Sequence, residues 1–215
     1  MDPKVRTAAN LELVGGRLCL DFANTVSTHG QAGREYLASY QDLLAWSQHA
    51  GILDEPQAQD LLRRAERHPQ RAAAALQGAI ALREAIYRVF AALAHGWGPQ
   101  APDLASLNAF LRTAHNKLEI AAMGGGFGWA WVPDEGDLAP MAWPIVHSAA
   151  DLLTSDALDR VSQCAGQNCD WLFLDTSKNH SRRWCTMAVC GSRAKMRRYY
   201  RRKTTKSTAP KGDHP

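Results

Sequence analysis

Apolar residues recur at the spacing of an α-helix through most of the first 155 positions. The clearest series lies in residues 76–93 and consists of Leu76, Ala79, Ile80, Ile86, Val89, Phe90 and Leu93. Residues three and four positions apart share one face of a helix, so this series predicts a helix with a buried face that ends at Gly96. Similar but shorter series predict further helices, which begin near Tyr40, Asp54, Pro102 and Pro144.

The pattern changes from helical to strand-like in three places. Residues 118–133 form two strand-like pieces joined by Gly124–Gly126, which predicts a β-hairpin. Residues 11–14 precede the turn residues 15–16 and predict a short strand that leads into a helix. Short strands are also predicted at Arg160–Gln163 and Trp171–Leu174.

We therefore predict a mainly α-helical protein in three parts. Residues 1–158 form a helical domain with one small β-hairpin. Residues 159–206 form a small module that contains a short β-hairpin and a basic helix. Residues 207–215 are polar and contain proline, which predicts a disordered tail.

Composition favours a globular protein outside the membrane. Hydrophobic residues make up 46% of the chain and charged residues 21%. No apolar run approaches the roughly 20 residues that a membrane helix needs, and the N-terminus lacks the apolar core of a secretion signal. We expect a cytoplasmic protein, in which reduced thiols favour metal binding over disulfides.

The charges are divided unevenly along the chain. Residues 1–175 contain 13 basic and 20 acidic residues, whereas residues 176–215 contain 12 basic residues and one acid, Asp213. The first part therefore has a net charge of −7 and the second a net charge of +11. Only the second part is expected to attract a polyanion.

Four of the five cysteines form two matched pairs. Cys164 and Cys169 are separated by four residues, as are Cys185 and Cys190, and 15 residues lie between the pairs. Zinc prefers four thiolates supplied as two close pairs from two chain segments, so this spacing predicts one zinc ion. Four cysteine ligands leave no open position, which indicates a structural rather than a catalytic metal.

Other interpretations of the cysteines are less favourable. Buried free cysteines would seldom fall into two equal pairs, and a reducing compartment disfavours disulfides. His180 could replace one cysteine, although it lies outside both pairs. Cys19 lies in an apolar run, which is typical of a small core residue rather than a nucleophile.

A strongly basic helix is predicted directly after Cys190, with Ser192 as its N-cap. Arg193, Arg197 and Arg201 form one row at i, i+4 spacing, and Arg198 and Arg202 lie in the adjacent row. Like charges at this spacing destabilise a helix, so a polyanionic partner is expected to relieve the repulsion. A merely solvated basic tail is the alternative. Met196, Tyr199 and Tyr200 interrupt the basic run and are expected to anchor the helix or to stack on bases.

The chain resembles a bacterial family, the CGNR zinc-finger proteins with an N-terminal ABATE domain. The C-terminal resemblance rests on the four cysteines, residues 173–175, 183–185 and 190–193, Asn179 and Lys195. The N-terminal resemblance rests on Gly16 and residues 20–25, LDFANT. The family's motif has Asn where this chain has Ser192, so base specificity could differ. The resemblance implies a transcription regulator whose finger binds nucleic acid.

Nucleic acid is therefore the predicted partner, with DNA favoured over RNA, although basic zinc modules also suit RNA. The candidate contacts are Arg182, Arg183, Ser192, Arg193, Lys195, Arg197, Arg198, Arg201 and Arg202.

The acidic helical domain is expected to sense a small-molecule effector, to form a homodimer or to contact transcription machinery. Asp21 and Asn24 are candidates for a ligand pocket, but such residues more often cap helices or satisfy buried backbone groups. Trp129, Trp131 and Trp143 are expected in the core or in a dimer contact. The sequence contains no GxSxG hydrolase motif, P-loop, dinucleotide-binding motif or HExxH motif. We therefore predict that the protein is not an enzyme. The alternative is a catalytic site formed by Asp21 and a histidine distant in the sequence.

Overall fold

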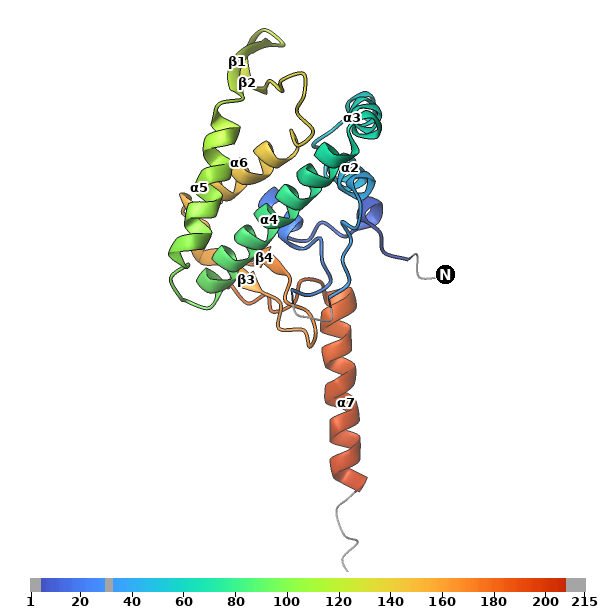
Figure 1. Ribbon diagram of the computed structural model, residues 1–215. Helices are drawn as coiled ribbons and strands as arrows, with labels where there is room; N and C mark the ends of the chain where they lie inside the picture. Colours follow the sequence, from blue (N-terminus) through green and yellow to red (C-terminus); the bar gives the residue numbers. More distant parts are fainter. Residues whose placement is uncertain (1–4, 30–32, 208–215) are drawn as a thin grey trace, which may run out of the picture.

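The computed structural model describes residues 5–29 and 33–207, and seven α-helices make up about half of this part of the chain (Figure 1). The helices are α1 (Leu18–Ala23), α2 (Tyr40–His49), α3 (Glu55–Arg67), α4 (Pro69–Ala94), α5 (Ala101–His115), α6 (Ala142–Leu153) and α7 (Ser192–Ser207). Two antiparallel hairpins are formed by β1 (Leu118–Met123) with β2 (Gly126–Trp131) and by β3 (Val161–Gln163) with β4 (Leu172–Leu174). Short 3-10 turns occur at Ala8–Asn10 and Leu158–Arg160. The predicted mainly α fold is confirmed.

Helix α4 is the centre of the fold, with α1, α2, α3, α5 and α6 packed around it (Figure 1). Its buried residues follow the helical series in the sequence and are Ala72, Leu76, Ala79, Leu82, Arg83, Ala85, Ile86, Val89 and Phe90. The N-terminus of α3 also follows the sequence, because the Asp54 side chain accepts a hydrogen bond from the Gln57 amide at 2.8 Å. The core is therefore organised by the longest apolar series.

The predicted strand at residues 11–14 is wrong. Among the described residues this segment has no place in either hairpin, and α1 begins after the predicted turn. The turn is set by close packing: a Cβ on Gly15 would lie 2.7 Å from the Asp21 amide nitrogen, and Gly16 has a φ of +74°. The segment meets β4 at this turn, where the Gly15 carbonyl accepts a hydrogen bond from the Leu174 amide at 2.8 Å.

The cysteine-containing segment shares the core of the helical domain. Strand β4 packs against α1, and β3 packs against α4. The Asn24 side chain donates to the Leu172 carbonyl and accepts from the Leu172 amide, both at 2.8 Å. The amide side chain thus pairs with the backbone of β4 as a neighbouring strand would. The Trp171 indole donates to the Val26 carbonyl at 2.7 Å. Packing is thus continuous across the domain boundary predicted at residue 158.

A buried ion-pair network fixes the segment before α2 to α4. The Arg83 guanidinium is 4% exposed and donates to both carboxylate oxygens of Glu35, at 2.6 and 2.7 Å. The His29 ring stacks on Tyr87, with 3.4 Å between centroids, and one ring nitrogen lies 2.9 Å from Glu84 Oε2. A buried charge requires such pairing. The helical periodicity gave no sign of these partners.

The first hairpin forms as predicted and projects beyond the ends of α5 and α6 (Figure 1). Its turn residues Gly124 and Gly125 have φ values of +51° and +93°, which glycine adopts without strain. The predicted disordered tail begins at Ser207, but that residue ends α7, and 208–215 lie outside the described residues. No helix in the described part of the chain is long and apolar enough to cross a bilayer.

We expect Asn24→Ala to lower the free energy of unfolding by about 2–6 kcal/mol. The substitution leaves a buried amide and a buried carbonyl of β4 without partners, at about 1–3 kcal/mol each. Urea denaturation of the zinc-loaded protein measures the loss. Asn10→Ala is the matched control, because the Asn10 side chain also bonds two backbone groups but is exposed to water. A similar loss in both variants would contradict a special role for Asn24.

Candidate metal centre and nucleic-acid interface

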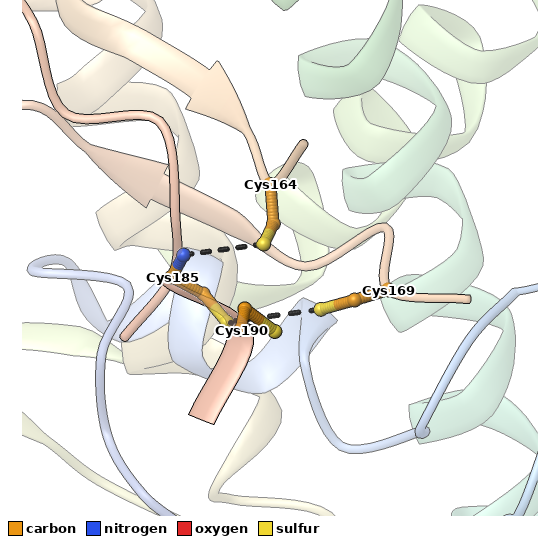
Figure 2. A group of neighbouring side chains, drawn as sticks. All are labelled: Cys164, Cys169, Cys185 and Cys190. Carbon is orange, nitrogen blue, oxygen red and sulfur yellow. Dashed lines mark hydrogen bonds between the residues drawn. The ribbon is translucent and has the colours of Figure 1, made fainter. Parts of the chain in front are cut away.

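The four predicted cysteines come together at one point (Figure 2). Cys164 follows β3, Cys169 precedes β4, Cys185 lies in the segment after β4, and Cys190 lies in the turn before α7. Their sulfur atoms all lie within 4.8 Å of one another. Among the described residues this is the one group of three or more histidine, cysteine or acidic side chains with metal-binding geometry, and His180 lies outside it.

The distances fit a tetrahedral zinc ion. Zinc–sulfur bonds of about 2.3 Å place tetrahedral sulfurs about 3.8 Å apart. The Cys169 and Cys185 sulfurs are 3.7 Å apart, and those of Cys185 and Cys190 are 3.6 Å apart. Three of the four side chains are buried, and the fourth, Cys169, is half-buried. Four sulfurs complete the coordination shell, so the site suits a structural zinc ion.

The chain leaves space for this cluster. A Cβ on Gly166 would lie 3.1 Å from the Cys190 sulfur and 3.3 Å from the Cys164 sulfur. The Cys185 amide donates a hydrogen bond to the Cys164 sulfur at 3.2 Å, as in a thiolate-binding turn. Asn168, directly before Cys169, has a φ of +58° that tightens the first loop. Neither Gly166 nor Asn168 stood out in the sequence, since each is an ordinary loop residue.

Hydrogen bonds among the thiols change their pKa values in opposite directions. The pKa of Cys164 falls to about 2, because Cys169 and then Cys185 donate hydrogen bonds to its sulfur. The same interactions raise the pKa values of Cys169 and Cys185, which act as donors to that sulfur. Metal ligation requires all four sulfurs as thiolates. A divalent cation bound by the four sulfurs would compensate the charge of the four thiolates.

Arg182 has an internal role, which differs from the predicted contact with nucleic acid. Its guanidinium lies 4.2 Å from the Phe173 ring centroid and donates to the carbonyls of Val14, Leu174, Trp184 and Cys185. The shortest of these bonds, to Cys185, is 2.6 Å. With its donors directed at four carbonyl oxygens, Arg182 holds the second cysteine segment against residue 14 of the helical domain.

The basic helix begins earlier than predicted. A π-helical turn at Met187–Gly191 runs directly into α7, and Thr186 caps it by accepting a hydrogen bond from the Val189 amide at 3.2 Å. Ser192 has helical backbone angles, so it is not the N-cap, and its hydroxyl donates to the Met187 carbonyl at 3.1 Å. Because Cys190 lies in this first turn, the partial positive charge of the helix N-terminus faces the thiolates.

Helix α7 projects away from the rest of the protein (Figure 1). The side chains of Arg193, Lys195, Arg197, Arg198 and Arg201 are exposed, and Arg202 lies on the same helix. An open hollow of about 790 Å³ at the base of α7 is walled by Trp184 and Met187. Its basic lining residues are Arg183, Lys195, Arg198 and Arg201.

The structure shows protein partners for both candidate ligand-pocket residues. Asn24 is 1% exposed, and its side chain pairs with the Leu172 backbone. Asp21 accepts a hydrogen bond from the Gly15 amide at 2.7 Å. Burial raises the Asp21 pKa to about 6, although that bond and the charge of His49 act in the opposite direction. His49 itself lies 2.7 Å from the Leu11 carbonyl, so these contacts stabilise the turn before α1.

We expect Cys185→Ser to abolish stoichiometric zinc binding, because it removes a central ligand of a closed four-thiolate shell. Metal analysis after gel filtration should fall from about one zinc per chain to near zero. Cys19→Ala is the control, since Cys19 is buried beside Ser148 and away from the cluster. One retained zinc in Cys185→Ser would show that three cysteines suffice.

Two family models match the chain in order. A model described as "Putative stress-induced transcription regulator", ABATE, matches residues 16–156, and the CGNR zinc finger matches residues 160–203. Neither describes an enzyme family. No curated protein gave a significant match. The zinc-finger match contains all four clustered cysteines, which fit one zinc ion. The chain belongs to the ABATE family and carries a C-terminal CGNR zinc finger.

Proposed function

We propose that the protein is a zinc-dependent nucleic-acid-binding protein that regulates transcription by binding DNA. The observation that carries this proposal is α7, a 16-residue helix that projects from a metal-binding cluster and has no acidic residue. A helix of this length spans about 24 Å. It has the diameter and charge to enter the major groove of duplex DNA.

Electrostatics support a polyanionic partner. Arg193 and Arg197 form one like-charged i, i+4 pair on α7, and Arg197 and Arg201 form another. Each such pair destabilises an isolated helix by about 0.2–0.5 kcal/mol. Phosphate groups along the helix would remove this repulsion and release bound counterions, which makes the affinity strongly salt-dependent.

The zinc ion is proposed as the scaffold for this helix. Cys190 is one ligand and lies within the turn that continues into α7. Loss of the metal would free the base of the helix from Cys164 and Cys169, which belong to the β3–β4 hairpin. Nucleic-acid binding should therefore require zinc even though no phosphate contacts the metal.

The helical domain is proposed as the regulatory part, acting through an effector, through dimerisation or on transcription machinery. The domain boundary predicted at residue 158 would then separate the regulatory part from the nucleic-acid-binding part, although the two share one core. Reduced cytoplasmic thiols would keep the cysteines available for zinc. Asp21 and Asn24 are better explained by their contacts with Gly15 and Leu172 than by a ligand.

RNA is the second candidate, and the hollow at the base of α7 favours it. An unstacked base would fit between Trp184 and Met187, with basic side chains nearby for its phosphates. Met196, Tyr199 and Tyr200 are 51%, 59% and 58% exposed, so they offer further surfaces for bases.

Enrichment of a random double-stranded DNA pool on the zinc-loaded protein tests the proposal. At near-physiological salt we expect a recovered sequence motif, which zinc chelation should abolish. A parallel RNA pool provides the comparison. Enrichment of RNA alone, with one zinc still bound, would overturn the DNA proposal in favour of the second candidate.

We expect Arg193→Ala to weaken binding to the selected duplex about tenfold or more, since one base or phosphate contact contributes roughly 1–3 kcal/mol. Competition titration at fixed salt measures the change. Arg112→Ala is the charge-matched control, because Arg112 is exposed on α5 in the acidic domain. Equal losses in the two variants would mean that only the net charge matters.

A further inference from the structure

The β1–β2 hairpin has one face made entirely of apolar residues. Side chains alternate between the two faces of a strand, so the pairing register places three cross-strand pairs on the same face. These pairs are Leu118 with Trp131, Ile120 with Trp129, and Ala122 with Phe127. The opposite face contains Glu119, the only charged residue in the two strands.

The helical domain covers only the base of this apolar face. Trp131 packs near Trp143 of α6, with 6.1 Å between ring centroids, and Trp143 is buried in the core. Farther along the hairpin, Ile120 is 68% exposed, Trp129 65% and Phe127 84%. The same face therefore passes from the core into solvent, at the end of the molecule opposite α7 (Figure 1).

The exposed apolar area is comparable with the largest patch on a typical monomer. An aromatic side chain covers about 150–250 Å² when fully exposed, so Phe127 and Trp129 alone present roughly 300 Å². Ile120 and Ala122 raise the apolar face to about 400–500 Å², within the range of the largest patch on a monomer, which is often functional. Two such faces would bury about 800–1,000 Å² together, which corresponds to a small and reversible interface.

Charge and backbone pairing favour a second copy of this chain as the occupant. An apolar face can meet its own copy without like-charge repulsion, as a twofold contact requires. In the described part of the chain, each strand of the hairpin pairs only with the other. A two-stranded hairpin is marginally stable unless further strands or helices cover a face, so a second hairpin would also stabilise the first.

We propose that the protein forms a homodimer through the apolar face of the β1–β2 hairpin, with Ile120, Phe127 and Trp129 as its centre. This contact is independent of zinc and nucleic acid. It joins two molecules at the ends opposite to their α7 helices.

Sedimentation velocity of the zinc-loaded full chain, without nucleic acid, tests the proposal. Between about 1 and 100 µM we expect the mass to rise from 23.6 kDa towards twice that value, as a small interface predicts. The double variant Phe127→Lys/Trp129→Lys should raise the dissociation constant at least tenfold, because central aromatic contacts dominate such interfaces. Its circular dichroism and zinc content should match those of the wild type.

Trp97→Lys is the matched control, since Trp97 is 67% exposed in the α4–α5 connection and lies outside the hairpin. This variant should dimerise like the wild type. A wild type that stays monomeric at about 100 µM overturns the proposal and leaves the face to another protein or a lipid surface. Equal weakening by Trp97→Lys also overturns it, because association would then reflect general stickiness. Neither outcome bears on nucleic-acid binding by α7.

Discussion

The convergence of four sulfurs within 4.8 Å is the constraint on which the C-terminal quarter depends. Each cysteine comes from a different piece of chain: the end of β3, the loop before β4, the segment after β4 and the turn before α7. Hydrogen bonds from Cys169 and Cys185 lower the pKa of the Cys164 thiol. Four thiolates at this distance would repel one another strongly without a cation. A bound metal therefore stabilises this path of the chain. The tight loop around it requires a left-handed backbone conformation at Asn168 and a residue without a side chain at Gly166.

This constraint also determines where the charge of the protein is displayed. Because Cys190 is a ligand and lies in the turn that becomes α7, the start of the basic helix is fixed by the metal. Beyond that turn the helix projects away from the helical domain (Figure 1). The side chains of Arg193, Arg197, Arg198 and Arg201 are exposed on it. The acidic helical domain, with a net charge of −7 through residue 175, remains at the other side of the cluster. A polyanion is thus attracted to one end of the molecule and repelled from the rest.

The sequence predicted the parts of the structure that depend on local periodicity and on cysteine spacing. The buried face of α4, the Asp54 cap of α3, the Gly124–Gly125 turn and the four clustered cysteines were all recognisable from residue type and interval. It did not predict interactions between distant segments. The basic character of Arg182 predicts a nucleic-acid contact but not its hydrogen bond to the Val14 carbonyl, 168 positions away. The residue type of Ser192 predicts an N-cap, but a π-helical turn at Met187–Gly191 precedes it, and Thr186 caps that turn. The strand predicted at residues 11–14 does not form, because in the described part of the chain this segment pairs with no other strand. Only the next residue, Gly15, bonds to β4, where its carbonyl accepts from the Leu174 amide.

These distant contacts give a physical meaning to the N-terminal motif by which the family was recognised. The zinc finger packs on residues 14–26 of the helical domain. The backbone carbonyls of Val14, Gly15 and Val26 accept hydrogen bonds from Arg182, Leu174 and Trp171, respectively. The Asn24 side chain pairs with the Leu172 backbone. The motif LDFANT lies within this segment. Its Asn24 docks the finger, Asp21 closes the turn that presents Gly15, and the Thr25 hydroxyl donates to the Phe22 carbonyl within the helical domain. The finger is consequently not a flexibly tethered module. A change in the helical domain that moved α1 would also move β4, and with it the cysteine cluster and the base of α7. The position of the cysteine cluster, and with it the base of α7, is therefore set by how α1 packs in the helical core.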